Sequence, residues 1–200
     1  MSDSETIDVY NRQVNEYAEL VNDTNEQSAL VSFAEHLPAN GYILDLGCGP
    51  GAAAAYLQKQ GFRVDAVDAS EEMIRVAQSQ LGMDARCAEF SDITSVNEYD
   101  GIWANFSLLH AKPDEFPVIL AALYQAIKPE GVFHIGMKLG EGSGRDNLGR
   151  YYSYYSQETL VSHLQDAGFS VISMEPGEGR GLAGTIDPWL LVLSSATKTL

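Results

Sequence analysis

Hydrophobic residues recur along the chain with two different spacings. In "VYNRQVNEYAELV" and "SALVSFAEHL" they follow the spacing of a helix, which predicts an N-terminal helical segment at about residues 6–36. A short apolar run at about 42–46 predicts the first strand, and "RVDAVD" predicts the second, with the small-residue helix "GAAAAYLQKQG" between them. Ser70 is a suitable N-cap for the helix that follows, and Gly82 ends that helix.

The second half of the chain continues the alternation of strands and helices. We expect strands in "DARCAE", "YDGIWANF" and "VFHIGMK", helices in "FPVILAALYQAIKPEG" and "SQETLVSHLQDAG", and two closing strands in "FSVISME" and "PWLLVLSS". The first of these helices is predicted to end at Pro129 and Gly131. This alternation predicts an α/β fold with a mostly parallel sheet covered on both faces. No linker or repeat interrupts it, so we expect one domain.

The composition indicates a domain that acts on a small molecule. No apolar run reaches the roughly 18 to 20 residues of a membrane span. With 28 acidic and 12 basic residues the formal net charge is −16, a surface that repels phosphate backbones, so we expect no nucleic acid and no membrane partner. Cys48 and Cys87 lack metal-ligand spacing, so we expect two reduced thiols and no metal. We expect a cytoplasmic protein. We also expect a monomer or a homodimer.

The stretch "ILDLGCGPG", residues 43–51, predicts a ligand-binding loop directly after the first strand. In an open parallel sheet, ligands lie beyond the carboxyl ends of the strands. Gly47, Gly49 and Gly51 let the backbone turn sharply and come close to a ligand. Asp68 ends the second strand, where a carboxylate can accept both hydroxyls of a ribose. These features are typical of a nucleotide site.

The glycine spacing differs from the NAD fingerprint G-x-G-x-x-G, because position 52 is Ala52 and the third glycine comes early. Asp45 also places a negative charge at the strand end, which suits an ammonium-bearing ligand better than a diphosphate. An NAD-dependent oxidoreductase is therefore a less favoured alternative.

Taken together, "ILDLGCGPG", "VDAVDASEEMI", "CAEF", "YDGIWANFSLLH" and "IKPEGVFHIGMK" resemble the motifs of the class I, Rossmann-like methyltransferases that depend on S-adenosylmethionine. The resemblance covers about residues 40–140, and it is to the small-molecule branch, of methyltransferase type 11/12 or the tellurite-resistance-like kind. It implies a seven-stranded, mostly parallel sheet of order 3-2-1-4-5-7-6 with the last strand antiparallel and helices on both faces. It also implies S-adenosyl-L-methionine as cofactor and S-adenosyl-L-homocysteine as product.

By position, the resemblance places Asp45 and the glycines beside the methionine part of the cofactor and Asp68 at the ribose hydroxyls. Where many relatives have Gly-Asp-Ala at the adenine edge, this chain has Ala88-Glu89-Phe90. The family often uses the N-terminal helices as a lid. The implied cofactor-binding residues are Asp45, Gly47, Cys48, Gly49, Gly51, Asp68, Ala69, Met73, Glu89, Phe90, Asn105 and Tyr17. Two alternatives remain. Asp45 could have a capping role without a ligand, and the side chains of Met73, Phe90, Tyr10 and Tyr17 could be ordinary core.

His110 is the catalytic candidate. A sulfonium methyl is already activated, so transfer needs chiefly an acceptor held in line and shielded from water. His110 follows "ANFSLL", where related enzymes border the transferred methyl, and a neutral imidazole there could accept the acceptor's proton. A purely structural histidine is the alternative.

The Gly- and Tyr-rich stretch "LGEGSGRDNLGRYYSYYS" predicts an irregular substrate loop at about 139–155, because recognition residues concentrate in loops. We expect its arginine and tyrosine side chains to receive an acidic or aromatic acceptor. The candidates for substrate binding are Lys138, Arg150, Tyr151, Tyr155 and Arg180. In the alternative interpretation, the tyrosines pack the loop onto the sheet and the arginines pair with Asp146 and Asp187.

The sequence therefore predicts a single domain over residues 1–200, with the lid at about 6–36 and the substrate loop at about 139–155. We expect an S-adenosylmethionine-dependent methyltransferase that acts on a small-molecule acceptor by in-line transfer. An alternative of another class is a regulatory domain that binds S-adenosylmethionine and transfers nothing.

Overall fold

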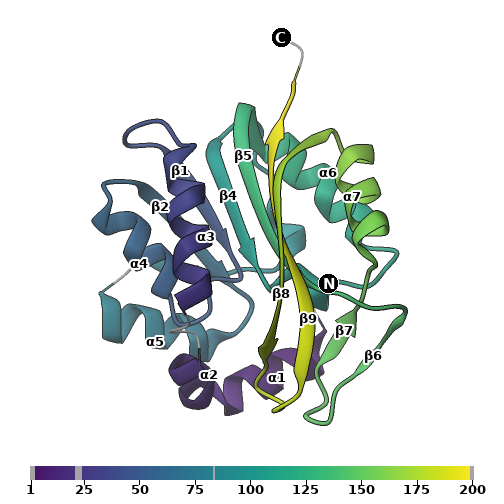
Figure 1. Cartoon of the computed structure of the whole chain (residues 1–200). Helices are drawn as coiled ribbons and strands as arrows, with labels where there is room; N and C mark the ends of the chain where they lie inside the picture. Colours follow the sequence, from purple (N-terminus) through teal and green to yellow (C-terminus); the bar gives the residue numbers. More distant parts are fainter. Residues whose placement is uncertain (1–2, 21–23, 83, 199–200) are drawn as a thin grey trace.

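Seven strands form the main sheet of the computed structural model, which describes residues 3–20, 24–82 and 84–198 (Figure 1). They are β1 (Tyr42–Leu46), β2 (Arg63–Asp68), β3 (Ala85–Cys87), β4 (Tyr99–Asn105), β5 (Ile127–Lys138), β8 (Phe169–Arg180) and β9 (Ile186–Ala196). The order is β3-β2-β1-β4-β5-β9-β8, with β1 to β5 parallel and β9 antiparallel to both neighbours. Counted within this sheet alone, the order is 3-2-1-4-5-7-6, so the predicted fold class is confirmed.

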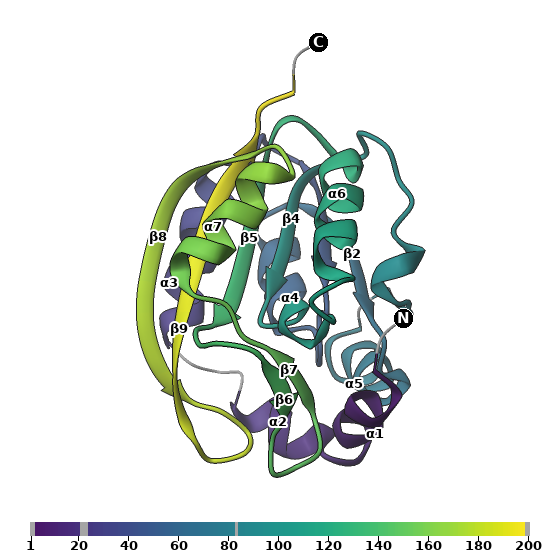
Figure 2. The ribbon, with the colours of Figure 1, turned by 90° about the vertical axis from the view of Figure 1, so that its right-hand side faces the viewer.

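Helices cover both faces of the sheet (Figures 1 and 2). On one face lie α3 (Thr24–Glu35), α4 (Ala52–Lys59) and α5 (Glu71–Leu81), and on the other lie α6 (Phe116–Ala126) and α7 (Gln157–Asp166). Side chains alternate along β1. Ile43 belongs to the apolar cluster that contains Phe33 of α3, whereas Leu44 and Leu46 belong to the cluster that contains Leu120 of α6. Two apolar layers therefore hold the sheet between the helices.

Two further pairs of elements lie across the carboxyl ends of the parallel strands. One is α1 (Ser4–Arg12) with α2 (Val14–Leu20), and the other is a hairpin of β6 (Ser143–Arg145) and β7 (Tyr151–Ser153) (Figures 1 and 2). Two short 3-10 helices, η1 (Phe90–Asp92) and η2 (Leu108–His110), follow β3 and β4 at the same end. Positions 21–23 of the predicted lid lie outside the described residues. Within the described ranges, no helix is long and apolar enough to cross a membrane.

One predicted helix ends earlier than expected. The helix predicted to reach Gly131 stops at Ala126, and β5 begins at Ile127. Lys128 precedes Pro129, and a residue before proline disfavours the helical conformation. From Ile127 onward the chain is extended and pairs with β4.

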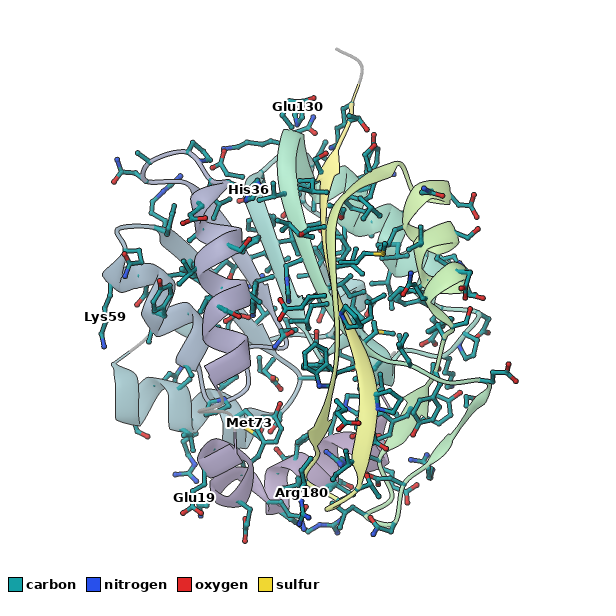
Figure 3. The ribbon with its side chains drawn as sticks, in the orientation of Figure 1. Glu19, His36, Lys59, Met73, Glu130 and Arg180 are labelled. Atoms are coloured by element: carbon teal, nitrogen blue, oxygen red, sulfur yellow. The ribbon has the colours of Figure 1, made fainter. Side chains whose placement is uncertain are left out.

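The N-terminal helix and the substrate loop also differ from the prediction. The helix breaks at Gln13, whose φ of −114° and ψ of 25° are not helical, and Val14 then joins a cluster with Met73 of α5. The predicted irregular loop contains the paired strands β6 and β7. The two closing strands are longer than predicted, so that Arg180 ends β8, and Glu130 lies at the opposite end of the molecule in Figure 3.

Candidate functional site

The glycine-rich turn after β1 is held against β2 by backbone hydrogen bonds. The N–H groups of Gly47 and Cys48 both donate to the carbonyl oxygen of Val67, at 2.8 and 2.9 Å. Gly47 has a φ of +78°, and a Cβ atom at this position would lie 2.3 Å from Cβ of Ser107. Only glycine therefore fits both the backbone angle and the space between the turn and the segment after β4.

Asp68 fixes the same turn from the end of β2. One carboxylate oxygen accepts the Gly49 N–H at 2.9 Å, and the other accepts the Ser70 N–H at 2.8 Å. Burial raises the pKa of the Asp68 carboxyl, although these backbone donors act in the opposite direction. Because each carboxylate oxygen has more than one lone pair, Asp68 can bind the turn and accept a ligand hydroxyl as well.

A pocket opens above this turn, between the carboxyl ends of β1, β2 and β4 and the helices α1 and α2. Its lining is Asp3, Thr6, Ile7, Tyr10, Tyr17, Leu46, Gly47, Gly49, Asp68, Ala69, Ser70, Met73, Ala88, Phe90, Phe106, Ser107 and His110. Of the predicted cofactor and catalytic residues, Tyr17, Gly47, Gly49, Asp68, Ala69, Met73, Phe90 and His110 lie in this lining. Met73 lies beside α2 in Figure 3. Most of the predicted site therefore converges on one pocket.

The other predicted cofactor residues are not part of this lining; they are Asp45, Cys48, Gly51, Glu89 and Asn105. Asp45 is 2% exposed within β1. Cys48 is buried, and burial raises the pKa of its thiol well above the usual range. Gly51 is the N-cap of α4, and Glu89 and Asp92 form a reciprocal cap on η1. The side-chain oxygen of Asn105 accepts a hydrogen bond from His134 at 3.1 Å.

Two lining residues without a predicted role lie directly after β4. Phe106 has a φ of +54°, an uncommon conformation for an aromatic residue, and its ring contacts the Trp189 ring edge to face at 6.2 Å. Ser107 is buried and donates to the Leu46 carbonyl oxygen at 2.6 Å. The sequence offers one indication of this site, since both residues follow the predicted fourth strand, where ligands bind in open sheets.

His110 connects the pocket to both elements that cover it. Its Nδ1 lies 2.6 Å from the carbonyl oxygen of Tyr151, and its Nε2 lies 2.9 Å from the hydroxyl of Tyr10. A carbonyl only accepts, so Nδ1 carries the proton, and Nε2 of the neutral ring accepts from Tyr10. Burial lowers the pKa of His110 to about 4, which keeps the ring neutral near pH 7.

The lid tyrosines lie over the glycine turn. Tyr10 and Tyr17 contact each other edge to face at 5.2 Å, and Cε1 of Tyr17 lies 3.3 Å from where a Gly49 Cβ would be. Both rings also pack against the cluster of Val14, Met73 and Val76. The tyrosines therefore make core contacts and line the pocket at the same time.

None of the five predicted substrate-binding residues is among the described residues that line the pocket. Arg150 is 2% exposed and forms an ion pair with Asp146, which confirms that part of the alternative interpretation. Lys138 pairs with Asp187 at 2.7 Å and lies over the Tyr152 ring. Both cations therefore already have carboxylate partners.

The remaining three candidates lie in different surroundings. Tyr151 contributes its carbonyl to His110 and its N–H to Thr6. Tyr155 is buried and stacks on Phe116 at 4.9 Å. Arg180 is exposed at the end of β8. Spacing along the sequence does not indicate these environments, because each depends on contacts with distant segments.

Comparisons with known proteins agree with this arrangement. A family model described as a methyltransferase domain matches residues 43–131. The chain is 25% identical over 176 residues to an uncharacterized methyltransferase of Staphylococcus carnosus, covering 84% of this chain and 85% of that protein. It is 29% identical over 144 residues to the carboxy-S-adenosyl-L-methionine synthase of Shewanella loihica, covering 66% of this chain but only 56% of the synthase.

One solved structure extends the comparison to nearly the whole chain. The 1,6-didemethyltoxoflavin-N1-methyltransferase of Burkholderia thailandensis, with bound 1,6-didemethyltoxoflavin and S-adenosylhomocysteine, superimposes with a TM-score of 0.76. The two chains are 25% identical, and the match covers 99% of this chain and 92% of that enzyme. The similarity therefore includes the N-terminal helices and the closing strands as well as the glycine turn.

Proposed function

Because the chain belongs to the class I S-adenosylmethionine-dependent methyltransferase family, we propose that it methylates a small, uncharged, planar acceptor in the pocket under α1 and α2. The observation that carries this proposal is the glycine turn, held open by Asp68 and roofed by aromatic side chains. S-adenosylmethionine, the methyl donor of the family, supplies an activated methyl group.

The residues of the pocket fit this cofactor. Gly47 and Gly49 leave space that a Cβ atom would fill, next to Ser107 and Tyr17. Asp68 lies in the lining with lone pairs that can accept hydroxyl donors of a ribose. Ala69, Met73, Ala88 and Phe90 supply the apolar lining that an adenine ring requires. We assign the ribose to Asp68 and the adenine to the Met73 and Phe90 side of the pocket.

The charges around the pocket favour an uncharged acceptor over the acidic acceptor that the sequence also suggested. Arg150 pairs with Asp146, Lys138 with Asp187, and Arg145 with Asp3 and Glu5. A carboxylate on the acceptor would compete with these carboxylates and meet their repulsion. The aromatic lining, by contrast, suits a flat ring. The Burkholderia thailandensis neighbour, an N1-methyltransferase for 1,6-didemethyltoxoflavin, supports the same acceptor class.

We propose that Tyr10 and His110 border the reacting atoms. Both line the pocket, and the neutral Nε2 of His110 accepts from the Tyr10 hydroxyl. A proton lost by the acceptor can pass to the Tyr10 oxygen as Tyr10 gives its own proton to Nε2. We therefore propose that His110 serves as the base through Tyr10 and does not contact the acceptor itself.

The first experiment is thermal unfolding with S-adenosylmethionine, S-adenosylhomocysteine, NAD or no ligand, for the wild type and Asp68→Ala. Ligand at a hundred times its dissociation constant stabilises by about 2.7 kcal/mol, or roughly 5 to 10 °C for this chain length. We expect this shift with both sulfur ligands in the wild type and a much smaller one in Asp68→Ala. Asp114→Ala, which removes an exposed acid outside the pocket lining, is the matched control.

The second experiment measures S-adenosylhomocysteine formation with planar ring-nitrogen acceptors and their carboxylate-substituted counterparts. We expect turnover of the uncharged members only. A shift with NAD alone would contradict the cofactor assignment, and faster turnover of the carboxylates would contradict the acceptor class. Binding of both sulfur ligands without turnover of any acceptor would favour a regulatory S-adenosylmethionine-binding domain.

A further inference from the structure

Arg150 is an arginine that the fold buries completely beside the proposed site. It is 2% exposed and is one of the largest fully buried side chains among the described residues. Its Nε and Nη2 donate to Oδ2 of Asp146 at 3.0 and 2.7 Å, and its Nη1 donates to the hydroxyl of Tyr10 at 3.1 Å. Burying a guanidinium is costly unless it is paired in this way.

The hydrogen bonds of Arg150 determine the direction of those that follow. A guanidinium only donates, so the Tyr10 oxygen must be the acceptor. The Tyr10 proton is then available for Nε2 of His110, whose other nitrogen donates to the Tyr151 carbonyl. From Arg150 through Tyr10 and His110 to the Tyr151 carbonyl, the hydrogen bonds therefore all run in one direction, while Asp146 accepts from the other side of the guanidinium.

The same contacts join two segments that are far apart in the sequence. The Arg150 guanidinium lies 5.3 Å from the ring centres of both Tyr10, on α1, and Tyr152, on β7. The Tyr151 N–H donates to Thr6 Oγ1 at 2.8 Å. At the outer edge, Arg145 forms ion pairs with Asp3 and Glu5. Figure 2 shows α1 and the β6–β7 hairpin side by side at the end of the molecule.

We propose that Arg150 is a positioning residue, which holds the Tyr10 hydroxyl over the pocket and makes α1 and the β6–β7 hairpin open and close as one lid. Arg150 contacts neither cofactor nor acceptor in this role. Instead it aims the Tyr10 proton at His110 and keeps the closed lid in place while water is excluded. The catalytic part of this inference rests on the proposed function, whereas the coupling of the two segments does not.

The test measures amide hydrogen exchange of the ligand-free protein in residues 4–12 and 143–153, with β1 and β4 as internal references. A hydrogen bond to a charged group is worth enough to change local opening by about 10- to 100-fold. In Arg150→Met we expect exchange to accelerate by this factor in both segments together and to stay unchanged in β1 and β4. Arg86→Met, which removes an exposed ion pair with Asp65, is the matched control and should alter neither segment.

Two further variants keep the test decisive. Arg150→Met leaves the Asp146 carboxylate without its ion pair, so Asp146→Asn with Arg150→Met restores the charge balance and should show the same fast exchange. Tyr10→Phe removes the hydroxyl that Arg150 orients, so its effect should not add to that of Arg150→Met, as expected for groups that act as one unit.

A readout of ligand release separates positioning from local structure. We expect S-adenosylhomocysteine to dissociate about 10- to 100-fold faster from Arg150→Met than from the wild type, because lid opening limits release. Fast exchange confined to 143–153, or additive effects of the two substitutions, would overturn the proposal. If Arg150→Met accelerates exchange in both segments but the wild type binds no S-adenosylhomocysteine, the coupling of α1 and the hairpin stands and the proposed function fails.

Discussion

His134 offers a quantitative test of how the fold treats a buried titratable group. It lies in β5, is 2% exposed, and stacks on Trp103 with ring centres 3.7 Å apart and planes 11° apart. Its Nε2 donates to the Asn105 side chain. Burial lowers the pKa of His134 to about 3, because the charged ring would lose its hydration.

The sign of the pH effect follows from proton binding in the two states. In the unfolded chain the pKa of His134 is about 6.5, so below this pH the unfolded state takes up a proton that the folded state does not. Stability therefore falls as the pH decreases from about 6.5 towards 3. At about pH 5 the loss attributable to His134 is about 2 kcal/mol relative to about pH 8.

The measurement is urea unfolding at both pH values, followed by tryptophan fluorescence, for the wild type and His134→Gln. Glutamine keeps a donor for Asn105 but does not titrate. His110, whose pKa is lowered to about 4, contributes a similar loss in both proteins and cancels in the difference. We expect the variant to lose about 2 kcal/mol less stability between the two pH values than the wild type. Equal losses in the two proteins would refute the argument that His134 is buried and neutral.

Three further predictions concern the turn and the surface. Gly47→Ala would bring a Cβ against Ser107 at a positive φ, so we expect a loss of about 1–3 kcal/mol in urea unfolding and loss of S-adenosylhomocysteine binding by calorimetry. Asp68→Asn turns an amide N–H towards a backbone donor, so we expect at least about tenfold weaker binding in the same calorimetry. Arg86→Gln removes the exposed Asp65 pair, so we expect a stability change of at most about 1 kcal/mol in urea unfolding and unchanged ligand binding.

Local patterns were sufficient to predict the sheet and the turn. The strands around Ile43 and Trp103 are short apolar runs, and the alternation of strands with helices leads to one parallel arrangement. Gly47 and Asp68 could be placed in the pocket because parallel strands bring their carboxyl ends to one edge. These inferences depend on neighbours in sequence or on the geometry common to all such sheets.

The lid could not be predicted in the same way. The partners Tyr10 and Arg150 are 140 residues apart, and no periodicity relates them. The stretch 139–155 is rich in glycine and was therefore interpreted as irregular, although the backbone of Tyr151 to Ser153 pairs with β6. For Arg150 the sequence left ligand binding and pairing with Asp146 both open, because the contact with Asp146 depends on the folded hairpin.

The hydrogen bond that Asp68 accepts from the Gly49 N–H of the glycine turn also affects the thermodynamics of ligand binding. A flexible turn would have to lose conformational entropy each time a ligand arrives, and that loss would weaken the affinity. Here the turn is ordered when the chain folds, since Gly49 donates to Asp68 and Gly47 and Cys48 donate to the Val67 carbonyl oxygen. Association should therefore be limited by the motion of α1 and the hairpin rather than by ordering of the glycine turn.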